Sequence, residues 1–114
     1  MIDQILVAAS IPAKPARFPD PPQTHAVYFD SIEPDGPDTG TPTSLSHDST
    51  IELYAPNISV GAEALQRLQV QLDSRGIRYK TQGWYWLSAI QRYQEVIEFT
   101  YTEKFLTGGN SNEN

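Results

Sequence analysis

The sequence contains no cysteine among its 114 residues, and it has only two histidines, His25 and His47. A chain without cysteine has no disulfide scaffold, no thiol nucleophile and no zinc module built on cysteine ligands. Neither histidine lies in an HExxH-like spacing that would bring carboxylates to a metal ion. We therefore expect no metal site and no cofactor.

Basic residues and long apolar runs are also scarce. Eight Lys and Arg stand against fourteen Asp and Glu, which gives a formal net charge of −6. This balance argues against a surface that neutralises nucleic-acid phosphates. No apolar run approaches the roughly 20 residues of a membrane-spanning helix, and residues 1–10 lack the basic start of a secretion signal. We expect a soluble protein of the cytoplasm.

Proline is in excess, with nine residues, five of which lie in residues 12–22. Each proline fixes φ and moves its predecessor out of the helical region, so this stretch is predicted to be an extended connector. Before it, Ile2, Ile5, Leu6 and Ala9 follow the spacing of a short amphipathic helix.

The next part of the chain predicts two strands separated by a long loop. Residues 24–30 are rich in β-branched and aromatic side chains, and residues 49–54 alternate in polarity up to Pro56. Residues 31–48 between them have no apolar period, which predicts a loop that is functional or disordered. We expect residues 33–47 to be among the most mobile of the chain.

Acidic side chains gather on or beside this predicted loop. Their oxygens could hold a hard cation, but they lack the DxDxDG order of a calcium loop, so solvated charges are the simpler account. The acids are Asp30, Glu33, Asp35, Asp38 and Asp48.

A helix is predicted over residues 60–75. Asn57 or Ser59 is placed as its N-cap, three leucines share one face, and Gly76 is placed for a left-handed C-cap. At 1.5 Å per residue such a helix spans about 24 Å, which is long enough to cross a small sheet.

Two further strands follow the helix. Residues 77–87 form a strand with a bend or bulge at Gly83, and the alternation in residues 92–103 predicts a long strand after a turn at 88–91. These two strands should pair antiparallel. The final strand would span about 40 Å, against a usual length of 5 to 6 residues, so we expect it to overreach its own sheet and to accept a strand from a neighbour.

The chain is thus predicted to be an α+β domain. A small, mostly antiparallel sheet of about four strands is packed by the helix over residues 60–75 and by the short N-terminal helix. Residues 1–106 form one domain, and residues 107–114 have nothing to bury and should be disordered.

Three large aromatics in a row, Trp84, Tyr85 and Trp86, exceed what a core of this size needs. In a strand, both tryptophans lie on one face and Tyr85 lies on the other. A protein interface and ordinary core packing are comparably good accounts, whereas a base-stacking platform conflicts with the acidic charge.

Catalytic chemistry is not apparent in the sequence. His47, Asp48 and Ser49 are the residue types of a nucleophilic triad, but adjacent residues point in different directions and cannot form the relay. We expect the protein not to be an enzyme.

Several segments resemble one protein family. They are the strand IELYAP at residues 51–56, the helix end RGIRY at 75–79, the YWL strand, and QRYQEVIEFTY at 91–101. Over residues 2–103 the chain resembles the small tail-terminator-like, head-tail joining proteins of long-tailed (siphovirus-type) bacteriophages and prophages.

The resemblance implies a structural protein without catalytic residues. It would assemble as a homo-hexameric ring on the head-proximal end of the tail tube, stop tube growth, and bind the tail tube protein and the neck (stopper) protein. Phage DNA would pass through the ring without specific binding. Such a protein belongs to the virion, and to the host cytoplasm during assembly.

These expectations assign provisional roles to individual residues. Trp84, Tyr85, Trp86 and Thr102 are the expected interface, and Asp35 and Asp38 are expected to face the lumen of the ring. Two alternatives remain open: another neck, head completion or tail assembly protein, and a small metal-dependent hydrolase that uses the acidic loop.

Overall fold

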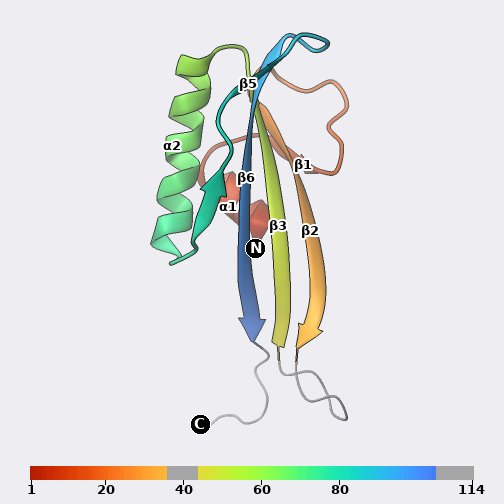
Figure 1. Ribbon diagram of the computed structural model, residues 1–114, viewed down its shortest axis with the longest axis vertical. Coiled ribbons are helices and arrows are strands. Elements are labelled where there is room, and N and C mark those ends of the chain that lie inside the picture. The colour runs from red at the N-terminus through yellow and green to blue at the C-terminus, as the bar shows by residue number, and fades with distance from the viewer. Residues whose placement is uncertain (36–43, 105–114) are drawn as a thin grey trace.

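The computed structural model describes residues 1–35 and 44–104, and Figure 1 shows how their elements are arranged. Two helices and a six-stranded mixed sheet confirm the α+β class. In chain order the elements are α1 (Ile2–Ala8), β1 (Ala13–Pro15), β2 (His25–Asp35), β3 (Ser44–Ala55), α2 (Ile58–Ser74), β4 (Tyr79–Thr81), β5 (Tyr85–Leu87) and β6 (Arg92–Lys104).

The sheet has the order β1-β2-β3-β6-β4. β5 also pairs with β6, at residues 92–94, whereas β4 pairs with residues 97–99. β1 and β2 are parallel, whereas every other pair is antiparallel. Two strands more than expected are present. One is β1, and the other arises because the predicted strand over residues 77–87 is divided into β4 and β5. Gly83 lies between them with φ +98°, a backbone conformation that favours glycine.

The proline-rich segment contributes a strand that the sequence analysis missed. Ala13 pairs with Ala26 and Pro15 pairs with Tyr28, so β1 is a short edge strand. Proline is tolerated there because one side of an edge strand needs no donor. The rest of residues 12–22 is irregular, as a connector should be.

The predicted loop over residues 31–48 is wrong for every residue of it that the structure describes. β2 continues to Asp35, β3 begins at Ser44, and their register runs without interruption from Asp30↔Ser49 to Asp35↔Ser44. Backbone hydrogen bonds between β2 and β3 hold these residues in register, although their side chains show no apolar period. Ser and Thr side chains fit a solvated strand face. Residues 36–43 and 107–114, for which mobility or disorder was expected, lie outside the described residues.

The main helix begins and ends close to the predicted positions. The side chain of Asn57 accepts a hydrogen bond from Val60 N–H at 2.9 Å, so Asn57 is the N-cap. Gly76 has φ +69° and Ile77 N–H bonds back to Leu72 O at 3.0 Å, which closes the helix.

The core lies between one face of the sheet and the two helices. We call this face the inner face; β3 and β6 contribute Ile51, Leu53, Ile97 and Phe99 to it, and the opposite face is the outer face. α1 and α2 both pack on the inner face, and Figure 1 shows that the far ends of β2, β3 and β6 extend past both helices. Within the described ranges, no helix is long and apolar enough to cross a membrane.

Candidate assembly interface

The ends of β2, β3 and β6 that extend past the helices form an arm, which comprises residues 29–35, 44–50 and 100–104. Elsewhere the sheet is closed by edge strands, because β1 pairs with residues 26–28 and β4 with residues 97–99. Among the described residues, no strand pairs with either side of the arm. Both sides therefore present unpaired backbone groups.

Two hydrogen bonds fix which backbone groups point toward the edges of the sheet. Ala16 N–H donates to Tyr28 O at 2.9 Å, and Gln82 N–H donates to Val96 O at 3.2 Å. The backbone groups of Tyr28 and Val96 therefore point away from β3, toward the two edges of the sheet. Successive residues of a strand turn their N–H and C=O to opposite sides. The even-numbered residues of β2 and β6, including Ile32 and Thr102, consequently face the open edges of the arm.

This geometry corrects the expectation of an overhanging final strand. β6 has 13 residues, but β3 accompanies it from Ala55↔Tyr93 to Ser44↔Lys104. β6 does not overreach its own sheet, because β2 and β3 are longer than predicted. Its open backbone groups lie along its side, and Thr102, which pairs with Ser46, is exposed there.

A buried histidine ties the three strands of the arm together on the inner face. His47 of β3 lies with Nδ1 2.8 Å from Asp30 of β2 and Nε2 3.1 Å from Glu103 of β6. Its ring stacks on Tyr101 with centroids 4.2 Å apart. Only the protonated imidazole can donate to both carboxylates at once. Burial, followed by the charges of Asp30 and Glu103, raises the pKa of Tyr101 to about 12, so its phenol stays neutral.

This cluster does not form a nucleophilic triad. The hydroxyl of Ser49 donates a hydrogen bond to Asp30 at 3.0 Å and not to His47. Asp48 lies on the outer face, on the opposite side of the sheet from His47. No group of three His, Asp or Glu side chains in residues 1–35 and 44–104 is placed to hold a metal ion.

The sheet divides the acids that the sequence analysis grouped together. Asp30 lies on the inner face, whereas Glu33, Asp35 and Asp48 lie on the outer face, and Asp38 is outside the described residues. Asp35 accepts a hydrogen bond from the hydroxyl of Ser46 at 2.5 Å. Apart from Phe29, which is 43% exposed, the rest of the arm's outer face is also polar: Ser31, Ser44, Thr50, Thr100, Thr102 and Lys104.

The three aromatics were expected to lie in one strand, but Trp84 lies outside β5. Trp84 precedes β5, is half-buried and packs on the core, where a Cβ added to Gly61 of α2 would lie 2.5 Å from its ring. Trp86 lies against Tyr93 at 4.8 Å between ring centroids, and Tyr85 is 68% exposed. Tyr85 and Trp86 thus remain available to a partner, whereas Trp84 fixes α2 to the sheet.

Sequence reasoning missed a buried carboxylate, Glu95, which is 2% exposed. Its oxygens accept from the backbone N–H of Gln82 at 2.8 Å, Gly83 at 2.9 Å and Val96 at 3.0 Å. Glu95 therefore holds the turn between β4 and β5. The sequence did contain a signal for this residue. Glu95 stands two residues before Ile97, so strand alternation puts its side chain on the same inward face as the apolar residues.

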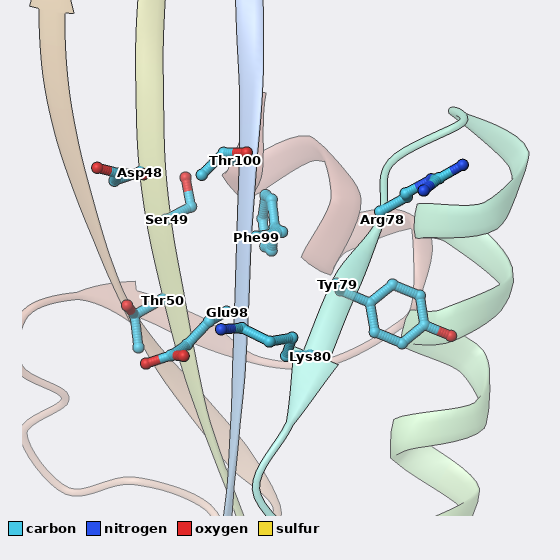
Figure 2. A pocket seen from close by; sticks show the side chains of 9 residues that line it. All are labelled: Asp48, Ser49, Thr50, Arg78, Tyr79, Lys80, Glu98, Phe99 and Thr100. Carbon is cyan, nitrogen blue, oxygen red and sulfur yellow. The ribbon is translucent and has the colours of Figure 1, made fainter.

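Two grooves mark the places where the arm begins. Figure 2 shows the first, of about 400 Å³, where Lys80 reaches across β6 toward Glu98 while Arg78 points away at the start of β4. The second, of about 480 Å³, lies between Ala16, which follows β1, and Ser31 of β2. Each groove opens where an edge strand leaves the sheet, and so each leads onto an open edge.

At the opposite end of the sheet, His25 forms part of a small aromatic cluster on the outer face. Its ring stacks on Tyr54 with centroids 4.9 Å apart, and Phe18 meets it edge-on at 5.4 Å. Burial lowers the pKa of His25, and the nearby charge of Arg92 lowers it further, while the 2.9 Å bond between Nδ1 and Pro22 O opposes both.

We expect this histidine to make stability depend on pH. The unfolded chain takes up a proton near pH 6.5, whereas the folded chain does so only at lower pH, so the free energy of unfolding should fall as the pH drops through 6.5. The slope from this residue is at most about 1.4 kcal/mol per pH unit. Urea denaturation at pH 5.0 and 7.5 should show a smaller difference in His25→Gln than in the parent, and an equal difference would contradict the assignment. Contributions from the rest of the chain are the same in both proteins and cancel in that comparison.

No family model matches the chain, and no curated protein sequence matches it either.

Proposed function

We propose that this protein is a structural component of a long-tailed bacteriophage that caps the head-proximal end of the tail tube and joins it to the neck. The observation that carries the proposal is the arm with its two open edges. The family resemblance supplies the hexameric ring and the place in the particle, and the arm supplies a physical means of forming such a ring.

Open edges on opposite sides of one arm suit repeated self-association. A long, unprotected edge is a site for adding another chain, and an interface between two different patches repeats around a closed ring when the rotation closes. Affinity between free subunits can be weak, since a tube end that presents several partners at once stabilises the ring by mass action.

The outer face of the arm fits the lining of a DNA channel. It carries Glu33, Asp35 and Asp48 among hydroxyl side chains and one exposed aromatic, Phe29, and Lys104 is its one cation within the described part of the arm. Carboxylates repel phosphates, so DNA would pass without being held. These charges support the proposal that Asp35 faces the lumen, and Asp38, which lies outside the described residues, is proposed to face it as well.

Exposed apolar side chains at the other end of the sheet fit a protein partner. Tyr85 and Trp86 of β5 are 68% and 42% exposed, and Ile90 in the following turn is 50% exposed. β5 lies at the end of the molecule opposite the tip of the arm (Figure 1). A ring with two different ends can bind the tail tube protein with one and the neck protein with the other.

Tail length tests this function. In the phage or prophage that encodes the protein, deletion of its gene should yield tubes that grow past the normal length, and expression of the parent protein in trans should restore the length. Negative-stain electron microscopy gives the distribution. An unchanged distribution in the deletion strain would contradict a capping role.

A further inference from the structure

The two open edges of the arm match each other in direction and position. β2 and β6 are both antiparallel to β3, so they run the same way. The register across the arm places Ser31, Glu33 and Asp35 of β2 level with Thr100, Thr102 and Lys104 of β6. A second copy in the same orientation therefore meets the β6 edge with its β2 edge, as a parallel strand.

From this match we infer a specific seam, in which β6 of one subunit pairs in parallel with β2 of the next subunit, with Thr102 opposite Glu33. The inference rests on the proposed ring-forming function and names the surfaces that would close the ring. In it, the occupant of both open edges is a second copy of this chain.

Backbone geometry favours this register. In a parallel pair, consider a residue whose backbone groups face the neighbouring strand. Its N–H donates to the C=O of the residue that precedes its pairing partner, and its C=O accepts from the N–H of the residue that follows that partner. Thr102 N–H would donate to Ile32 O, and Thr100 O would accept from Ile32 N–H. Lys104 N–H would donate to Pro34 O, whereas Thr102 O would face the ring of Pro34, which has no N–H, so this one acceptor of the seam would stay unpaired. A shift by one residue would turn these groups away from each other.

Side chains along the seam are complementary on both faces of the sheet. On the outer face, Lys104 would lie beside Asp35 and close to Glu33, while its neighbour Glu103 is directed to the inner face, where it binds His47. On the inner face, Ile32, which is 52% exposed in the single subunit, would lie beside Tyr101. The pairing thus offers a carboxylate partner to the lysine and an apolar neighbour to the isoleucine.

Cross-linking tests the seam directly, because the chain has no cysteine of its own. Opposed Cα atoms in neighbouring strands are about 5 Å apart, within reach of a disulfide. We would mix Thr102→Cys protein with Glu33→Cys protein at high concentration and on tails, under mild oxidation. The inference predicts mixed dimers from the two variants together, and a ladder ending in a closed ring from the double variant.

Controls keep the outcomes distinct. Thr102→Ser with Glu33→Ser should assemble as the parent does, and Thr102→Cys with Gln66→Cys, on the exposed side of α2, should not cross-link. Main products joined through two Thr102→Cys or two Glu33→Cys chains would overturn the seam, as would cross-links from Thr102→Cys to the tube protein. Rings seen by native mass spectrometry without any cross-link would overturn the seam alone. No oligomer at high concentration or on tails would overturn the proposed function as well.

Discussion

Thr102→Pro should yield a folded protein that no longer caps tails. Thr102 is exposed, and its N–H faces the open edge, so proline removes no bond to β3. In the ring, the same change removes a donor from every seam and brings a proline ring against the neighbouring strand. A lost hydrogen bond costs about 1 to 3 kcal/mol, which is roughly a 5-fold to 140-fold loss of affinity at each contact.

Far-ultraviolet circular dichroism and urea denaturation check the fold of this variant, and tube length in the complementation assay checks its activity. Thr102→Val is the matched control, because valine keeps the N–H and favours a strand; it should complement fully. Normal capping by a folded Thr102→Pro protein would show that strand pairing at this position does not hold the ring.

Glu95→Ala should be the most destabilising change outside the apolar core. It removes the acceptor of Gly83 N–H, the acceptor of Val96 N–H and one acceptor of Gln82 N–H, which retains Val96 O at 3.2 Å. A buried donor without a partner costs about 1 to 3 kcal/mol, so we expect a loss of roughly 2 to 4 kcal/mol in the free energy of unfolding once the weakened Gln82 contact is included.

Urea denaturation with an unchanged m-value measures this loss. Glu95→Gln keeps one acceptor oxygen and should lose less. Glu98→Ala is the matched control on the outer face, where the carboxylate's one hydrogen bond within the described residues is a 3.5 Å contact with Gln82 Nε2, and it should change stability by less than about 0.5 kcal/mol. Equal stability of Glu95→Ala and Glu98→Ala would show that Glu95 does not hold the turn.

Local patterns predicted the elements that depend on local forces. The main helix could be predicted because Asn57, Gly76 and the leucine spacing act within a few residues of one another. The final strand could be predicted because its inward side chains alternate. In both cases the period of burial is visible without knowledge of the partner.

The arm could not be predicted, because it depends on pairing between distant segments. Residues 31–35 and 44–48 lack an apolar period because most of their side chains face water, and register with the neighbouring strand is what makes them strands. For the same reason the sequence placed Asp30 and Asp48 in one acidic group, whereas strand alternation separates them. The position of the open edges is set by the residues at which β1 and β4 end. No local sequence pattern indicates those ends.

Location in the particle tests the central claim most directly. A Gln66→Cys protein carries a single thiol on the exposed side of α2, so a maleimide gold cluster can label it at one site. Labelled protein added to tails from the deletion strain should appear by electron microscopy at the head-proximal end of each tube and nowhere else. Gold along the tube, at the distal tip, or on heads without tails would contradict the account.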